Sequence, residues 1–183
     1  MAQLRGVVAA LGHAEVSTYI QSGNVLFTPL QAGVVAARNA ESGEGGTGDA
    51  ELAVGLERAI ADGMGVEARV VVLSREELAQ AVHDNPYPRE ANPKLLHAVF
   101  LPGTAAPELV AWVADAQAQA RAKGGRDEAR IMGRTVYLHT PDGYGRSELA
   151  MLFTRAGGPT SARVAGTARN WATVTKLLEL CGG

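Results

Sequence analysis

Apolar residues recur along this chain at helical spacing in some segments and in short β-forming runs in others, which predicts a mixture of helices and strands. The apolar positions of residues 4–11 follow helical spacing, and Gly12 is a favourable residue for the end of that helix. β-forming residues flank a polar tripeptide at 22–24, which is typical of a tight hairpin over 18–27 or of one strand with a glycine bulge. The pattern then dissolves over residues 31–49, whose Gly, Ala, Ser and Glu residues predict a solvated loop.

After this loop the two periodicities alternate. Helices are predicted from Asp49 to Gly63, after the Ser74 and Glu77 capping box, over 107–121, over 147–155 and from Asn170 onward. Strands are predicted over 66–73, 95–101, near Arg130, over 135–139 and over 162–165. Such alternation in two similar halves indicates an α+β fold of two small ferredoxin-like lobes, with antiparallel or mixed sheets and flanking helices. A proline-containing break at 85–93 places the lobes at 1–84 and 94–183.

Composition narrows the classes of protein to which the chain can belong. Lys and Arg number 17 against 19 Asp and Glu, so the formal charge of -2 excludes the broad basic field of a non-specific nucleic-acid binder. Cys181 is the single cysteine, which excludes an intramolecular disulfide and a thiolate zinc site. No segment reaches the run of about 18 apolar residues that a membrane span requires, and no signal-peptide pattern is present. We therefore expect a cytoplasmic protein with no membrane partner.

The residues that usually carry metal or nucleophilic chemistry are scattered. The four histidines show no i, i+4 pair and no Cys or carboxylate neighbour at metal-ligand spacing. No nucleophile elbow, P-loop or dinucleotide fingerprint is present. We therefore expect no metal, no cofactor and no catalytic nucleophile. His97 and His139 lie in predicted strands and could face each other across a sheet.

The strongest candidate for a binding surface is the segment 166–180, in which polar residues accompany an amphipathic helix. Its candidate residues are Thr167, Arg169, Asn170, Trp171, Thr173 and Lys176. Asn170 is expected to cap the helix, along which Arg169, Thr173 and Lys176 follow at i, i+4 and i+7. An anionic ligand would meet Arg169 or Lys176, with Trp171 as a stacking surface. Alternatively, Trp171 fills the core and the cations form a solvated face.

A second candidate is the glycine-containing segment 142–147, which ends in Arg146 and Ser147. An Arg beside a helix N-terminus can hold a phosphate or a carboxylate. The simpler interpretation, which we favour, is a turn followed by a Ser147 helix cap, because Glu148 in the first turn would repel an anion.

A third candidate comprises Gln21, Ser22 and Asn24, which interrupt an apolar strand pattern. They could line a groove or contact the edges of nucleic-acid bases. A turn explains the same residues, and it is the interpretation that we favour.

Three segments together resemble a known bacterial family. They are TYIQSGNVLF from Thr18, YLHTPDGYGRSEL from Tyr137 and GTARNWATVTKL from Gly166, with weaker agreement through NPYP from Asn85 and KLLHAVFL from Lys94. The chain is similar to the family known as domain of unknown function 1697, which implies a two-lobed α+β fold and no assigned activity.

Three differences from that family are expected. The chain would start within the first helix without the usual preceding strand, which would leave a sheet edge open to self-association. Its glycine-rich loop around 38–49 is longer, and Glu148 stands where a basic residue is common.

Three functions remain open at this stage. The leading hypothesis is a non-catalytic module whose second lobe binds an anionic ligand, such as a nucleotide or a nucleic-acid segment, through Arg146, Arg169 and Lys176. One alternative is an enzyme, a hydrolase or a transferase, with a site between the lobes and water activated by Asp142 or His139. Another is a scaffold that works by self-association, as a homodimer for example.

Overall fold

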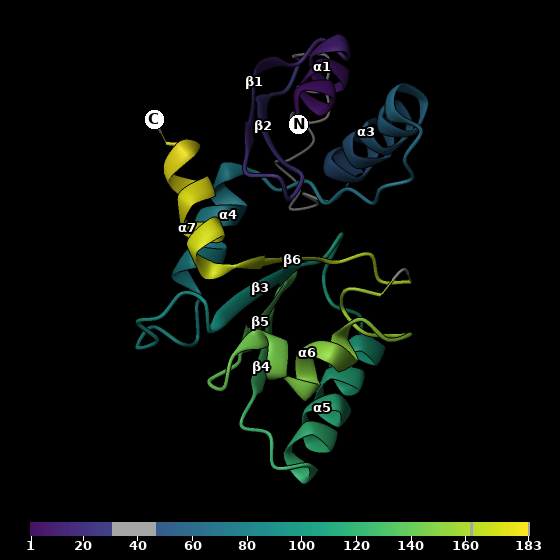
Figure 1. Ribbon diagram of the computed structural model, residues 1–183. Coiled ribbons are helices and arrows are strands. Elements are labelled where there is room, and N and C mark those ends of the chain that lie inside the picture. Colours follow the sequence, from purple (N-terminus) through teal and green to yellow (C-terminus); the bar gives the residue numbers. More distant parts are fainter. Residues whose placement is uncertain (31–46, 162, 183) are drawn as a thin grey trace. The chain divides into compact units, whose positions relative to one another are not determined.

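The computed structural model describes residues 1–30, 47–161 and 163–182 of the chain. Its internal contacts divide the chain into two compact units, Met1–Val72 and Leu73–Gly183. Each unit contains helices and one antiparallel sheet, so the predicted α+β class is confirmed (Figure 1).

The described residues of the first unit form two helices and a hairpin. Helix α1 (Ala2–Ala10) leads into β1 (Ala14–Tyr19), which pairs with β2 (Asn24–Thr28), and α3 (Thr47–Met64) follows. The hairpin alternative for this segment is therefore the observed one. Gly12 has a φ of +86°, a conformation that glycine adopts without strain, so the predicted end of the first helix is confirmed. Helices α1 and α3 pack together, and Gln3 Nε2 donates to the Gly63 carbonyl oxygen at 3.1 Å.

Two expectations for the first unit are revised. Most of the predicted loop over 31–49 lies outside the described residues, and its last residues belong to α3, which begins at Thr47 rather than after Asp49. The strand predicted over 66–73 is wrong, because this segment forms neither helix nor strand. In this segment the Val70 N–H donates to Glu57 Oε1 at 2.9 Å. The glutamate side chain thus takes the place of the backbone carbonyl that a neighbouring strand would provide.

The second unit is built around a four-stranded antiparallel sheet with the order β4-β5-β3-β6. Its elements are α4 (Arg75–His83), β3 (Leu96–Phe100), α5 (Pro107–Ala122), β4 (Glu128–Met132), β5 (Thr135–His139), the 3-10 turn η3 (Tyr144–Arg146), α6 (Glu148–Phe153), β6 (Thr167–Asn170) and α7 (Trp171–Leu180). From β3 to β6 the strands and α-helices therefore follow the order β-α-β-β-α-β, and α7 comes after them.

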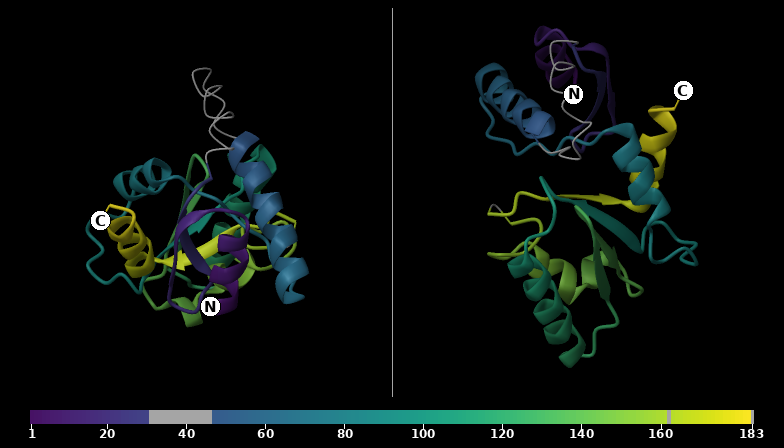
Figure 2. Two further views of the ribbon diagram at one scale, coloured as in Figure 1. Left: turned by 90° about the horizontal axis from the view of Figure 1, so that it is seen from above. Right: turned by 180° about the vertical axis from the view of Figure 1, so that it is seen from behind.

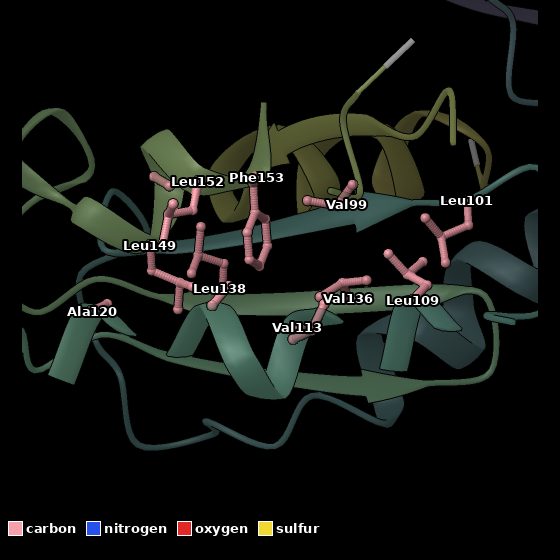
Figure 3. Packing of buried hydrophobic residues seen from close by; sticks show 12 residues of the cluster. Val99, Leu101, Leu109, Val113, Ala120, Val136, Leu138, Leu149, Leu152 and Phe153 are labelled. Carbon is pink, nitrogen blue, oxygen red and sulfur yellow. The ribbon is translucent and has the colours of Figure 1, made fainter. Parts of the chain in front are cut away.

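The core of the second unit lies between one face of the sheet and the helices α5 and α6 (Figure 3). Aliphatic side chains fill it, with Phe153 as its large aromatic member. Its residues include Val99, Leu101, Leu109, Val113, Val136, Leu138, Leu149, Leu152 and Phe153. Burial of this apolar surface is the main source of stability for such a layer. Helices α4 and α7 lie side by side against the opposite face of the sheet (Figures 1 and 2).

The pairing register assigns each strand residue to one of these two faces. His97 lies opposite Leu138 of β5 and Asn170 of β6, on the face that α5 and α6 cover. Ala98 lies opposite Tyr137 and Arg169, on the face that α4 and α7 cover. The adjacent β6 residues Arg169 and Asn170 therefore lie on opposite faces of the sheet.

Helix α4 belongs to the second unit. Tyr137 donates its phenolic hydrogen to the Ala81 carbonyl oxygen at 2.7 Å, and Arg134 Nη1 contacts Glu77 Oε1 at 2.8 Å. The division at Val72 therefore differs from the boundary expected at 85–93, which had assigned this helix to the first lobe. A short amphipathic helix does not reveal from its own sequence which sheet its apolar side contacts.

The last strand also differs from the expectation. The strand forms at Thr167–Asn170, whereas residues 163 and 164 lie in a turn and residue 165 is irregular. Of the strand predicted over 162–165, residue 162 lies outside the described residues and the rest is misplaced. The N–H groups of Val164 and Ala165 both donate to the Ser161 carbonyl oxygen, which leaves them unable to join a ladder.

Candidate functional site

Two of the three candidate motifs meet at His97, in the second unit. The Tyr144 ring, from the segment 142–147, lies against the imidazole with ring centroids 4.2 Å apart and planes inclined at 36°. Asn170, from the segment 166–180, lies directly opposite His97 in the β3–β6 ladder. We refer to His97, Tyr144 and Asn170, together with Arg146 at the end of the turn that carries Tyr144, as the His97 cluster.

The His97 imidazole lies in an unusual environment for a polar group. Its Nδ1 atom is buried and has no hydrogen-bond partner among the described residues. An unsatisfied buried polar atom costs about 1–3 kcal/mol, so such atoms in a folded protein call for an explanation. Burial lowers the pKa of His97 to about 4, which keeps the ring neutral at physiological pH.

The remaining members of the cluster offer polar and aromatic surface. Tyr144 is 37% exposed, and burial of the rest of its side chain raises its pKa. Arg146 is exposed at the end of η3. Asn170 accepts a hydrogen bond from the Thr173 N–H at 2.9 Å through Oδ1, so it caps α7 as expected and its amide nitrogen remains a donor.

Ser147 has the structural role that we favoured. Its hydroxyl oxygen accepts from the Ala150 N–H at 2.8 Å, and its hydroxyl hydrogen goes to Asp127 Oδ2 at 2.8 Å. Both Ser147 and Asp127 are buried. Glu148, which we expected to repel an anion, forms an ion pair with Lys123 at 2.8 Å. That pairing reduces the repulsion.

Arg169, Thr173 and Lys176 do not form the expected stripe along one helix. Arg169 lies in β6, on the face opposite His97, and Nη1 donates to Thr167 Oγ1 and the Ala168 carbonyl oxygen. Thr173 is buried, and Lys176 lies on α7 with its Nζ 2.8 Å from Glu179 Oε2. The predicted i, i+4, i+7 spacing was wrong because the chain is extended up to Asn170.

Trp171 and the hairpin residues lie outside the His97 cluster. The Trp171 ring centroid is 6.2 Å from that of Tyr137, which lies on the sheet face of α4 and α7. In the first unit, Gln21 and Ser22 are exposed in the turn between β1 and β2. Asn24 is buried and donates to the Tyr19 carbonyl oxygen at 3.3 Å and to Ser22 Oγ at 2.9 Å. These contacts agree with the turn interpretation.

A second polar cluster lies where the loop after α4 meets the end of β5. His139 Nε2 is 2.7 Å from Glu90 Oε2, and the Tyr87 ring stacks on His139 with centroids 5.0 Å apart. These three residues line a surface pocket together with Pro86, Pro88 and Arg89. Sequence reasoning named His139 but missed Glu90, because 49 residues separate the two along the chain.

The electrostatics of this cluster follow from its neighbours. Hydrogen bonds from the Asn92 N–H and from His139 lower the pKa of Glu90. Burial raises the pKa of Tyr87 to about 12, and the Glu128 carboxylate adds to the shift. His97 and His139 do not face each other, because they lie on opposite faces of β3 and β5.

Asp142, the other acid considered for catalysis, is bound by an arginine. Arg126 Nε donates to Asp142 Oδ2 at 3.0 Å, and Nη2 of the same guanidinium contacts Oδ1. This bidentate contact is the main cause that lowers the pKa of Asp142, and Arg146 adds to it. A carboxylate held in this way is a weak base.

Neither metal clusters nor membrane helices occur in the part of the chain that the structure describes. No group of three or more His, Cys, Asp and Glu side chains is placed there to hold a metal ion. None of the helices in that part has both the length and the apolar character needed to cross a bilayer.

Comparisons with known proteins agree with this architecture. The family model described as "Protein of unknown function (DUF1697)" matches residues 1–137. The conserved bacterial protein SP0830 from Streptococcus pneumoniae has a similar solved structure, with a TM-score of 0.62 and 19% sequence identity. That match covers 99% of this chain and 88% of the other, and at this identity it shows the fold alone. No curated protein matches the sequence.

Proposed function

Because the chain belongs to the DUF1697 family, for which no function is assigned, we propose a function from the geometry of the second unit. We propose that the protein is a non-catalytic module that binds an anionic ligand at the His97 cluster. The ligand class is a nucleotide or a short nucleic-acid segment. One observation carries the proposal, namely the meeting of the Tyr144 ring and Asn170 at an imidazole whose Nδ1 has no hydrogen-bond partner among the described residues.

The chemistry of the cluster supports this ligand class. Arg146 provides an exposed guanidinium, which binds phosphate and carboxylate groups with directed hydrogen bonds. The exposed part of Tyr144 provides an aromatic surface on which a base can stack. Asn170 provides an amide donor beside His97. The formal charge of -2 gives no general attraction for polyanions, so binding would depend on this local group.

Arg169 and Lys176 have a smaller part in this proposal than the sequence indicated. Arg169 lies on the other face of β6, away from the cluster, and burial there lowers its pKa. Lys176 lies beside Glu179, which offsets its charge. We therefore propose Arg146 as the principal cation.

Isothermal titration calorimetry with AMP, ATP and a short single-stranded oligonucleotide tests the proposal. We expect Arg146→Gln to weaken binding by at least about tenfold, because a hydrogen bond to a charged group contributes about 1.5–3 kcal/mol. Arg155→Gln is the matched control, since Arg155 is also exposed in the second unit but lies outside the cluster. Binding should weaken further as salt increases. A wild-type protein that binds none of these ligands would refute the proposal.

An enzyme is a second candidate, which the contact between His139 and Glu90 favours. A carboxylate that accepts a hydrogen bond from an imidazole orients the ring, which suits a general base. The pocket beside His139 could hold a small ester or phosphoester.

Turnover of chromogenic ester and phosphoester substrates tests this second candidate. We expect His139→Gln to abolish any hydrolysis that the wild type shows, and Glu90→Gln to reduce it. Glu76→Gln, at an exposed glutamate on α4, should leave the rate unchanged. Residual turnover at the wild-type rate in His139→Gln would rule out this site.

A further inference from the structure

His97 has a nitrogen atom that can bind a ligand but is covered in this structure. Nδ1 is buried and has no hydrogen-bond partner among residues 1–30, 47–161 and 163–182. The Tyr144 ring lies against the same imidazole at a centroid distance of 4.2 Å. Tyr144 itself is 37% exposed, so the covering ring lies at the surface rather than in the core.

The segment that carries Tyr144 is one 3-10 turn, closed by hydrogen bonds from the Arg146 N–H to the Gly143 carbonyl oxygen and from the Ser147 N–H to the Tyr144 carbonyl oxygen. It is anchored on one side by the hydrogen bond from the Gly143 N–H to the Thr140 carbonyl oxygen, and on the other by the buried Ser147 side chain. Between these anchors, Gly143 and Gly145 flank Tyr144, and neither has an atom within 4 Å of the position that a Cβ would occupy. Gly143 has a φ of +94°, which glycine reaches at low cost.

We propose that Tyr144 is a movable cover, and that the anionic group of a phosphoryl-type ligand displaces it to hydrogen-bond with Nδ1 of His97 and the side-chain amide of Asn170. This inference rests on the proposed function of the His97 cluster and specifies how that site recognises its ligand. Binding transfers one proton from solvent to the imidazole, because an imidazolium beside a tetrahedral anion forms a charge-assisted hydrogen bond. Arg146 at the end of the same turn neutralises further charge.

The state of His97 in the covered form agrees with proton uptake on binding. Burial lowers the pKa of His97 to about 4 and is the cause of the shift, with no contribution from a charged side chain in the described part of the chain. The ring contact and the strand register place the aromatic Tyr144 and the neutral Asn170 and Leu138 beside the imidazole. When Tyr144 moves away, the His97 imidazole is no longer buried and the cause of its lowered pKa is removed. An adjacent dianion then favours the protonated imidazolium.

Sulfate is the probe for this inference, because it remains a dianion throughout the pH range of interest. Calorimetry in buffers of different ionisation enthalpy at pH 6 should show uptake of a substantial fraction of one proton per sulfate bound. An NMR titration should show that the pKa of His97 increases when sulfate is added. In Tyr144→Ala, sulfate should bind at least fivefold more tightly, because no cover has to be displaced. Tyr144→Phe is the matched control and should bind as the wild type does.

The outcomes separate this inference from the proposed function. His97→Gln should abolish proton uptake, while the His97 titration in the wild type gives the same information if that variant does not fold. The proposal that Tyr144 covers His97 would be refuted if sulfate bound without proton uptake, or if Tyr144→Ala bound sulfate with the affinity of the wild type. Nucleotide binding that still depends on Arg146 would then leave the proposed function intact. A wild type that binds neither sulfate nor nucleotide would overturn both.

Discussion

Asn170 lies directly opposite His97 in the ladder between β6 and β3, whereas its neighbour Arg169 lies opposite Ala98. Because strand side chains alternate between faces, the two residues cannot serve one site, although they are adjacent in sequence. Asn170 also ends the strand and caps α7. Asn170 therefore has two roles, because it stabilises the last helix and also forms part of the candidate site.

Replacement of Asn170 should separate these two roles. Asn170→Ala removes the hydrogen bond to the Thr173 N–H and should lower the free energy of unfolding by about 1 kcal/mol. Asn170→Asp keeps the accepting oxygen and places a negative charge at the helix N-terminus, so its stability should stay close to that of the wild type. Urea denaturation of both variants measures the difference. An equal loss in both would contradict the capping role.

Ser147 should contribute more stability than an ordinary helix cap. Ser147→Ala removes the bond to the Ala150 N–H and also leaves the buried Asp127 carboxylate without its hydroxyl donor, so we expect a loss of about 2–4 kcal/mol. Ser74→Ala is the matched control, because Ser74 caps α4 in an exposed capping box and should cost about 1 kcal/mol. Thermal melting compares the two. Similar melting temperatures would show that the contact with Asp127 adds nothing.

Gly166 lies where the chain enters β6 and has no room for a side chain. A Cβ there would approach the Pro159 carbonyl oxygen to 2.3 Å and side-chain atoms of Leu101 and Val99 to 3.1 Å. Gly166→Ala should therefore lower stability by about 2 kcal/mol or more, because the backbone must shift. Gly103→Ala, where no atom lies within 4 Å of the Cβ position, should change stability by less than about 1 kcal/mol.

The contact between Glu90 and His139 should contribute to stability in a defined pH range. Because the Asn92 N–H and His139 lower the pKa of Glu90 below its ordinary 4.5, the contribution is present above pH 4.5 and disappears as the pH falls through the folded-state value. Glu90→Gln should therefore be less stable than the wild type at pH 7, and the difference should vanish in strong acid. Glu76→Gln should show no such pH-dependent difference. Unfolding measured across pH checks both.

His97 should influence stability in a different pH window. The unfolded chain protonates this imidazole near pH 6.5, whereas the folded protein does so only near 4, so stability should decrease as the pH falls between these values. In His97→Gln the decrease should be smaller over that interval. Denaturation at pH 6.5, 5.5 and 4.5 provides the comparison, and equal slopes for the two proteins would contradict the burial of a neutral ring.

Local chemistry was readable from the sequence where a few adjacent residues determine it. The capping box of Ser74 and Glu77, the Ser147 and Asn170 caps and the end of the first helix at Gly12 depend on neighbours within three residues. The α+β class followed from the alternation of two periodicities.

The candidate site could not be assembled in the same way. That Tyr144 and Asn170 meet at His97 depends on strand register and sheet order, which no local pattern specifies. The same limit explains the wrong prediction for Arg169. The sequence does not mark where the strand ends and the helix begins, so Arg169 was placed on the helix with Thr173 although it lies in β6. Glu90 and His139 meet through a long-range contact of the same kind.

The junction between β6 and α7 has no connecting residue, because the strand ends at Asn170 and the helix begins at Trp171. We therefore expect a displacement of Asn170 to move the indole, which lies near Tyr137 on the other face of the sheet. Because Trp171 lies away from the His97 cluster, we expect it to report ligand binding by fluorescence without contacting the ligand. A change in the fluorescence emission of Trp171 on ligand addition would show that a shift of Asn170 is passed on to α7. The variant Trp112→Phe would remove the emission of the other tryptophan.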